Sequence, residues 1–419
     1  MNSLCISAIA SNQGKTILTT ALLYHFRESV RPFKIGPDFI DPQFHKQVCG
    51  VDSVNLDSFI MSKEQVAWIY RRYANKQINI LEGVMGFYDG ENRGCSAYSV
   101  SRLLNIPTIL VLDGSGSYIT ISAVLQGLLS YKKENTIQAV VLNKLSSAMH
   151  YALIKKQIET DHPQIMVLGW IQKNLPALSN THLGLDLKDL NKIKQISQEV
   201  LEHIDLARLK TLAQKSPPIA TNVVYPFPSS KHLDEKLAIV HDQNFSFLYY
   251  DNLCFLREIF SEVILIDATQ DQPIPTDCDR VYICGGYVES QEAYERIKNA
   301  HQFKASLIEH AQSKPIYAEC AGLLYLGKAV DEKKMSGILD IEFQLEKRFV
   351  RLGYYHNEIG IKGHAFHYTR PSPESLAKGF DPLRKTPSAK GEAGSWSQGK
   401  IWGTYLHTMF RSYPWLITQ

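Results

Sequence analysis

A short polar loop near the start of the chain carries residue types that bind phosphate. It lies between an apolar run at residues 4–9 and a helix-like stretch at residues 17–26. The residues expected to bind the nucleotide here are Ser11, Asn12, Gly14, Lys15 and Thr16. A loop that opens a helix aims backbone N–H groups and the positive end of the helix dipole at an anion. Lys15 would add positive charge at the outer phosphates, and the Thr16 hydroxyl would hold Mg²⁺. The sequence therefore predicts a nucleotide site here.

Acidic side chains follow two further strand-like runs of the same half. The loop Gly-Pro-Asp-Phe-Ile-Asp-Pro supplies Asp38 and Asp41, and the next apolar run ends in Glu82, followed by a glycine-punctuated loop that carries Asp89. Ligands of parallel α/β sheets collect at the carboxyl ends of the strands. We therefore expect catalytic roles for these four acids. We also expect Asp38 and Glu82 to join Thr16 as Mg²⁺ ligands.

The C-terminal half carries a second set of reactive residues. Cys320 lies between a short apolar run and a helix-like run, which is the sharp turn that exposes a nucleophile. Backbone N–H groups of Gly285, Gly286 and Ala321 could stabilise an oxyanion. His407 follows another apolar segment and could act as the base. A thiol at a helix N-terminus is expected to have a lowered pKa.

The elements that must position these residues alternate between strand and helix. In the first half, strand-like runs are predicted at residues 4–10, 31–35, 78–82, 107–113 and 137–143. This alternation is typical of a parallel α/β sheet with helices on its faces. A charged helix is expected at 186–214, and a Pro- and Ser-rich segment then precedes a new strand at 237–240. The expected organisation is a first domain at 1–214, a linker at 215–235 and a second α/β domain at 236–419.

Several stretches resemble the cobyrinic acid a,c-diamide synthase family. They are residues 33–45, 55–57 and 82–90, together with Ser11 and the Gly-Lys-Thr run of the loop. The Cys, glycine pair and His of the second half resemble a class I glutamine amidotransferase of the cobyrinate type. The resemblance implies a P-loop domain similar to dethiobiotin synthetase, followed by that amidotransferase domain. Asn143 resembles the adenine-reading Asn of related P-loop enzymes, although an Asn that merely ends a strand would look the same.

The resemblance also implies a reaction. ATP, with Mg²⁺, would convert a carboxylate into an acyl phosphate, and ammonia released from L-glutamine at Cys320 would displace the phosphate. The substrate would be cobyrinic acid, amidated on its a and c acetate side chains during cobalamin biosynthesis. A homodimer is compatible with this assignment.

The sequence departs from the family pattern at three positions. Ala8 replaces the first glycine of the loop, and because Ala resists positive φ we expect a slightly reshaped loop. Met409 stands where many class I amidotransferases carry the acid of an H-x-E motif, and Ala365 replaces another family acid. Either Glu289 or Glu319 could supply the missing carboxylate, and spacing does not decide between them.

Composition excludes several other classes. The chain has 419 residues with a formal net charge of +3 and no long block of Lys or Arg, so neither nucleic acid nor a membrane surface is an expected partner. No stretch approaches the length of a membrane span, and no signal segment precedes the first strand. Seven scattered cysteines without metal-ligand spacing suit a reducing compartment. A cytoplasmic protein is expected.

Three alternatives to cobyrinate amidation follow from these residues. The same chemistry could act on nickel sirohydrochlorin. A P-loop switch of the chromosome-partitioning kind would share the first fold but would have no use for the Cys and His half. An amidotransferase-like scaffold with an inactive glutaminase is suggested by Met409 and Ala365.

Overall fold

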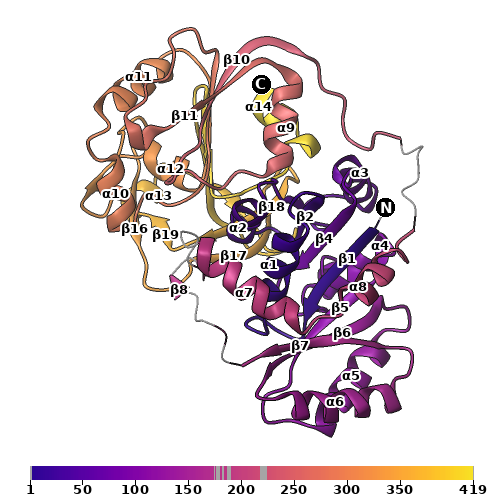
Figure 1. Cartoon of the computed structure of the whole chain (residues 1–419). Coiled ribbons are helices and arrows are strands. Elements are labelled where there is room, and N and C mark those ends of the chain that lie inside the picture. Colours follow the sequence, from indigo (N-terminus) through magenta and orange to yellow (C-terminus); the bar gives the residue numbers. More distant parts are fainter. Residues whose placement is uncertain are drawn as a thin grey trace. The chain divides into compact units, whose positions relative to one another are not determined.

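The computed structural model describes residues 2–173, 175, 180–181, 184–185, 190–217 and 224–418. The chain divides into two compact units, Met1–Pro226 and Phe227–Gln419 (Figure 1). The start of the helix predicted at 186–214 and part of the linker predicted at 215–235 lie outside the described residues.

The first unit alternates strands and helices along the chain. Its elements are β1 (Asn2–Ala8), α1 (Lys15–His25), β2 (Val30–Ile35), α2 (Ile40–Cys49), β3 (Val54–Leu56), α3 (Lys63–Tyr73), β4 (Ile78–Gly83), η1 (Glu91–Arg93), α4 (Ala97–Leu103), β5 (Thr108–Asp113), α5 (Ile119–Tyr131), β6 (Ile137–Leu145), α6 (Ala148–Asp161), β7 (Met166–Gln172), β8 (Asn180–Thr181), β9 (Gly184–Leu185), α7 (Leu190–Glu202) and α8 (Leu206–Ala213). The five predicted strands are present, with ends within two residues of the expected ones. β3, β7, β8 and β9 were not predicted as strands. β3, β8 and β9 are very short, and β7, which contains Gly169 at φ 151°, pairs with β6 through register shifts.

The main sheet of this unit is entirely parallel. Its strand order is β3-β2-β4-β1-β5-β6-β7. Apolar side chains from α1, α2, α7 and α8 join those of the strands in one buried cluster on one face. In Figure 1, α5 and α6 lie side by side beyond β5, β6 and β7. Because β2, β4 and β1 are adjacent and parallel, the loops that follow them lie together at the carboxyl ends of these strands.

The single helix predicted at 186–214 is wrong, since two helices fill the described part of this range. α7 ends at Glu202 and α8 begins at Leu206. The backbone between them pairs with β7, because Ile204 forms an isolated bridge with Gly169. The Asp205 side chain accepts a hydrogen bond from Arg208 N over 2.9 Å and caps α8. Strand pairing and this cap stop one helix and start the next.

The second unit also alternates strands and helices before ending in antiparallel strands. Its elements are β10 (Leu233–Val240), α9 (Tyr250–Ile259), β11 (Phe260–Ile266), η2 (Ala268–Gln270), β12 (Arg280–Ile283), α10 (Gln291–Ile297), α11 (His301–Ala311), β13 (Ile316–Glu319), α12 (Ala321–Leu326), β14 (Ala329–Val330), β15 (Lys333–Lys334), β16 (Glu342–Leu345), β17 (Arg351–His356), β18 (Lys362–His367), β19 (Thr369–Pro371), α13 (Pro373–Leu376), β20 (Asp381–Leu383), β21 (Glu392–Gln398), β22 (Ile401–Thr404), η3 (Phe410–Ser412) and α14 (Trp415–Thr418).

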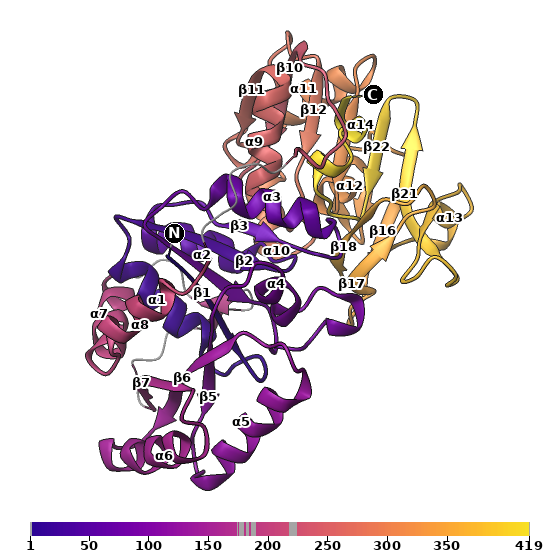
Figure 2. The same ribbon diagram turned by 90° about the vertical axis from the view of Figure 1, so that its right-hand side faces the viewer.

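The main sheet of the second unit has the order β11-β10-β12-β13-β22-β21-β20. The five strands from β11 to β22 are parallel, whereas β21 and β20 are antiparallel additions at one edge. Figure 2 shows β21 and β22 as neighbours. Because β12, β13 and β22 are adjacent and parallel, the segments that follow them meet at one edge. Among the described residues, no helix is long and apolar enough to cross a membrane.

Candidate active sites

The predicted phosphate loop lies between β1 and α1. Asn12 and Gly14 have positive φ angles of 62° and 96°. A Cβ atom added at Gly14 would lie 2.2 Å from Nδ2 of Asn143. That Asn143 nitrogen, at the carboxyl end of β6, donates to the Gln13 carbonyl oxygen over 2.8 Å. Glycine is therefore required at position 14 by both backbone conformation and space, and Asn143 braces the loop.

The substitution of Ala8 for the family's glycine causes no conflict in the loop. Ala8 is the last residue of β1, is fully buried, and is not among the described residues with positive φ. The reshaping expected from this substitution is therefore not needed, because the backbone is still extended at this position. The positive φ angles fall later in the loop.

Lys15 opens α1, and its ammonium group folds back over the loop. Its Nζ donates to the Ala10 carbonyl oxygen over 2.9 Å, and the side chain is buried. Burial, and then the charge of Lys34, lower the pKa of Lys15. Ser11, with Asn12, is exposed at the tip of the loop. The loop thus combines a lysine charge with a turn of left-handed backbone at a helix N-terminus, which suits a phosphate group.

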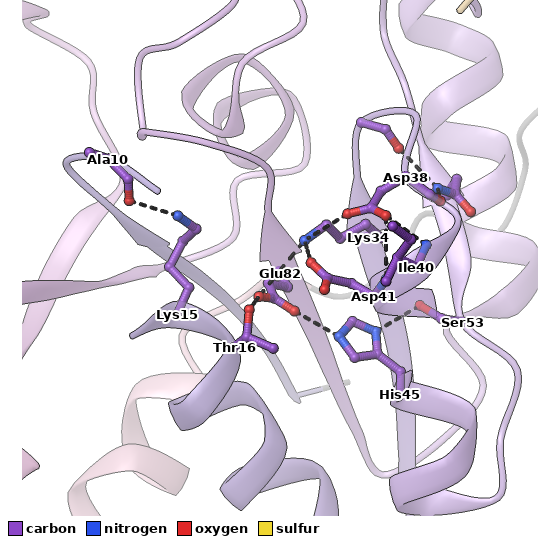
Figure 3. A network of polar contacts seen from close by, with 12 residues as sticks. Ala10, Lys15, Thr16, Lys34, Asp38, Ile40, Asp41, His45, Ser53 and Glu82 are labelled. Carbon is purple, nitrogen blue, oxygen red and sulfur yellow. Dashed lines mark hydrogen bonds and ion pairs between the residues drawn. The ribbon is translucent and has the colours of Figure 1, made fainter. Parts of the chain in front are cut away.

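Glu82 links the start of α1 to α2, as Figure 3 shows. It is fully buried near the end of β4. Its Oε1 accepts a hydrogen bond from the Thr16 hydroxyl over 2.7 Å, and its Oε2 lies 2.7 Å from Nε2 of His45. The other ring nitrogen of His45 lies 3.1 Å from the Ser53 hydroxyl. Glu82 is thereby held in one orientation beside the phosphate loop.

Lys34, like His45, is a residue of this site that sequence reasoning did not assign. It lies on β2 opposite Glu82 on β4, and its side chain is only 2% exposed. Its Nζ donates to Asp41 and lies 3.5 Å from Asp38 Oδ2 and 3.8 Å from Glu82 Oε1. Burial opposes the charged ammonium, but Glu82, Asp41 and Asp38 outweigh it and raise the pKa of Lys34. A lysine inside an apolar strand was the available signal, because such a residue is rarely buried without charged partners.

Asp38 and Asp41 belong to the turn that starts α2. Asp38 Oδ1 accepts hydrogen bonds from Ile40 N over 2.8 Å and from Asp41 N over 3.3 Å. Burial raises the pKa of Asp38, against the effect of Lys34. Burial would also raise the pKa of Asp41, but Lys34 and His45 outweigh it and lower that pKa. The two acids therefore differ in their tendency to ionise.

The predicted metal ligands Thr16, Asp38 and Glu82 are only partly brought together. Thr16 and Glu82 are in direct contact, whereas the Lys34 ammonium group lies near both Glu82 and Asp38. Within the described part of the chain, no group of three or more His, Cys, Asp or Glu side chains could hold a metal ion. Magnesium in phosphoryl-transfer sites needs only one or two protein ligands besides phosphate and water, so Thr16 and Glu82 fit it. Asp38 contacts the Lys34 ammonium group instead, 3.5 Å from its Nζ.

Asp89 lies apart from the buried acids. It is exposed, and its Oδ2 accepts a hydrogen bond from Gly86 N over 2.7 Å. Its charge nevertheless acts on Lys15, whose pKa it raises slightly against the effect of burial. Of the four predicted catalytic acids, Asp89 is therefore the one turned toward solvent near the phosphate loop.

Cys320 occupies the sharp turn between β13 and α12. Its backbone angles are φ 44° and ψ −101°, a strained conformation for a residue with a Cβ atom. Its N–H donates to the Thr404 carbonyl oxygen over 2.7 Å, which ties the turn to the end of β22. Functional sites often carry such strain. Here the strained turn places the thiol directly after the carboxyl end of β13.

His407 contacts a carboxylate that precedes the cysteine in the chain. Its Nδ1 lies 3.1 Å from Oε2 of Glu319, and both side chains are almost fully buried. Tyr282 and Tyr317 donate hydrogen bonds to Glu319 over 3.1 and 3.3 Å. Between the two carboxylates that spacing left open, the structure places Glu319 at the imidazole. Met409, two residues after the histidine, is buried.

The predicted oxyanion residues lie around the two reactive side chains. The backbone N–H groups of Ala321 and Gly286 act to lower the pKa of Cys320. Gly285 lies against His407 instead, because a Cβ atom added to it would be 2.1 Å from His407 Cε1. Gly286 and Ala321 remain the candidates for the oxyanion amides, and Gly285 makes room for the imidazole.

The predicted lowering of the cysteine pKa is wrong. Burial, with the charges of Glu289 and Glu319, raises the pKa of Cys320, and the two N–H groups only partly oppose this. The helix after Cys320 has six residues, so its dipole is small against the loss of solvation. The thiol is consequently neutral until a base removes its proton.

Comparisons with known proteins point to one family. Residues 236–415 match the family described as a CobB/CobQ-like glutamine amidotransferase domain. Proteins named cobyrinate a,c-diamide synthase match from end to end. The one from Listeria monocytogenes is 32% identical, with 100% of this chain and 98% of that protein covered. The chain belongs to the cobyrinate a,c-diamide synthase family.

Two further members of the family are similar over most of their length. The protein from Fusobacterium nucleatum is 32% identical over 99% of both chains, and that from Caldanaerobacter subterraneus is 33% identical over 93% of this chain and 91% of its own. The predicted family and the predicted fold class, two α/β units with a P-loop type sheet and an amidotransferase domain, are confirmed. A P-loop switch without an amidotransferase half does not describe this chain.

Proposed function

We propose that the protein amidates the a and c acetate carboxylates of cobyrinic acid, with ATP and L-glutamine as co-substrates. The observation that carries the proposal is that one chain holds both a phosphate loop with a buried acid and a cysteine with a histidine and a carboxylate. Thr16 of the phosphate loop contacts Glu82, and His407 behind the Cys320 turn contacts Glu319. The seven free cysteines suit a reducing compartment, and we place the reaction in the cytoplasm.

In the first unit, a substrate carboxylate must be activated before ammonia can replace its oxygen. A carboxylate oxygen would attack the γ-phosphorus of ATP, giving an acyl phosphate and ADP. Lys15 and the loop N–H groups would stabilise charge on the transferring phosphoryl group. Lys34, held by Asp38 and Asp41, offers a positive charge for the substrate carboxylate or the acyl phosphate.

Mg²⁺ would neutralise phosphate charge in this site, and Thr16 and Glu82 would hold it. Their oxygens are 2.7 Å apart at the start of α1, so a hydroxyl and a carboxylate are already side by side. His45 fixes the other oxygen of Glu82, which limits the movement that binding would need. Asn143 braces the loop, and its place at the carboxyl end of β6 also suits contact with the nucleotide base.

In the second unit, the Cys320 sulfur would attack the carboxamide carbon of glutamine. His407 would take the thiol proton and return it to the leaving ammonia, and water would then release glutamate from the thioester. The N–H groups of Gly286 and Ala321 would stabilise the negative oxygen of the tetrahedral intermediate. Glu319 supplies the carboxylate that Met409 does not, which argues against an inactive glutaminase.

The substrate is tested by incubating the enzyme with ATP and glutamine and either cobyrinic acid or nickel sirohydrochlorin. We expect mass spectrometry to show two successive amidations of cobyrinic acid. Amidation of nickel sirohydrochlorin alone would move the assignment to that substrate, and glutamine hydrolysis without amidation of either would refute it.

A further inference from the structure

Glu289 is an acidic residue of the amidotransferase unit that the reaction above does not use. It follows the glycine pair in the segment between β12 and α10. His407 contacts Glu319 and not Glu289, so the carboxylate of Glu289 is left for another role. Its Oε2 accepts a hydrogen bond from Val288 N over 2.9 Å, and among the described residues no Lys, Arg or His nitrogen lies within 4.0 Å of the carboxylate.

The segment that carries Glu289 is held firmly beside the nucleophile. Gly286 has φ 149°, and a Cβ atom there would lie 2.0 Å from the Asn244 carbonyl oxygen. That oxygen accepts a hydrogen bond from Tyr287 N over 2.8 Å, and the Asn244 side chain donates to Ala293 O in α10. Gly285 of the same anchored turn packs against His407, since an added Cβ atom there would lie 2.1 Å from His407 Cε1. The turn that carries Glu289 therefore borders the proposed glutaminase site.

The charge of Glu289 opposes the chemistry of its neighbour. Burial is the largest cause of the raised pKa of Cys320, and the charge of Glu289 is the next largest. The same charge also raises the pKa of Tyr405. Burial also raises the pKa of Glu289, and Lys333 only weakly offsets this. A half-buried carboxylate without a cation, next to a thiol that must ionise, works against catalysis unless a bound molecule brings a positive charge.

We propose that Glu289 binds the α-ammonium group of glutamine and thereby selects glutamine over simple amides. The inference rests on the proposed glutaminase reaction. Glutamine carries its ammonium group at a short distance from the carboxamide that Cys320 attacks, so one molecule can reach both side chains. Binding would pair the carboxylate, and the opposition to thiolate formation at Cys320 would fall when glutamine is in place.

The first test measures substrate preference in Glu289→Gln. Hydrolysis of L-glutamine is compared with hydrolysis of glutaramate, which has the same carboxamide and carboxylate but no α-amino group. Loss of one charge-assisted hydrogen bond should raise KM for glutamine roughly 10- to 100-fold. The rate with glutaramate should change little, so the preference for glutamine should collapse. The matched control is Glu292→Gln on α10, where the side chain is 83% exposed and pairs with Arg296.

The second test uses two reagents that alkylate Cys320, followed by peptide mass spectrometry. Glu289→Gln should react faster than wild type with iodoacetamide, because the carboxylate that opposes the thiolate is gone. It should react more slowly with 6-diazo-5-oxo-L-norleucine, which carries the α-ammonium group. A damaged site would slow both reactions and would overturn the inference.

The remaining outcomes separate the inference from the proposed function. Equal loss of kcat with glutamine and glutaramate would mean that Glu289 acts in the chemistry and not in recognition, which overturns the inference. A wild type that hydrolyses glutamine, with a Glu289→Gln variant that keeps the full preference, would overturn the inference alone. A wild type that hydrolyses neither amide would overturn the proposed glutaminase.

Discussion

Glu319→Gln should slow glutamine hydrolysis while preserving the fold. The carboxylate accepts hydrogen bonds from Tyr282 and Tyr317 and lies 3.1 Å from His407 Nδ1. Glutamine has the same shape, and its carbonyl oxygen can still accept from the imidazole, but it lacks the negative charge that would stabilise the imidazolium formed during the reaction. A hydrogen bond to a charged group contributes about 1.5–3 kcal/mol and a neutral one about 0.5–1.5 kcal/mol. The lost stabilisation is then about 1–1.5 kcal/mol, or about a tenfold lower kcat.

The assay is glutamate release from glutamine, with ammonium-driven amidation and thermal unfolding measured on the same preparations. Ammonium-driven amidation by Glu319→Gln should match wild type, because the phosphoryl chemistry belongs to the other unit. Its thermal unfolding should also match wild type, because glutamine has the same shape as glutamate. Glu319→Ala should differ by losing stability as well, since it leaves two phenol groups and an imidazole nitrogen buried without their acceptor. Wild-type glutaminase activity in Glu319→Gln would refute the argument that Glu319 replaces the missing acid at position 409.

Three further predictions concern the charged and titrating groups of the two units. Glu82→Gln should reduce ATP-dependent amidation by about 100-fold or more, because it removes a buried carboxylate that contacts Thr16 and His45. Asp89→Asn should have a smaller effect, because Asp89 is exposed. Equal effects of the two substitutions in steady-state amidation would contradict this order. Alkylation of Cys320 by iodoacetamide should still accelerate above about pH 10, where an ordinary thiol of pKa about 8.5 has levelled off, because burial and Glu289 raise the pKa of Cys320. A plateau by about pH 10 would contradict this. Burial and His407 lower the pKa of His364 to about 3, so the stability linked to a neutral His364 is complete above about pH 6.5 and is lost as the pH falls toward 3; the unfolding temperature of His364→Gln should therefore depend less on pH between about 7 and 4 than that of wild type.

Local patterns in the sequence sufficed for the reactive residues that follow strands. The phosphate loop and the Cys320 turn each combine a strand end, a tight turn and a helix start within about ten residues, so neighbouring residues determine them. The alternation of strands and helices likewise predicted both α/β units. These features depend on short-range geometry, which a single sequence records.

Contacts between distant strands could not be predicted in the same way. Lys34 lies opposite Glu82 only because β2 pairs with β4 in that register, although 48 residues separate them. Glu319 reaches His407 only because β13 pairs with β22. The thiol pKa was mispredicted for a related reason, since the burial that raises it comes from the whole unit and not from the six-residue helix beside it.

The central claim is that one unit activates a carboxylate and the other releases ammonia. Its most direct test is amidated product formed by Lys15→Ala and by Cys320→Ser, each with glutamine or with ammonium chloride as nitrogen source. Lys15→Ala should form no product with either source, because the acyl phosphate cannot form, and Cys320→Ser should lose synthesis with glutamine but keep it with ammonium chloride. Near wild-type synthesis by Lys15→Ala, or glutamine-driven synthesis by Cys320→Ser, would contradict the account.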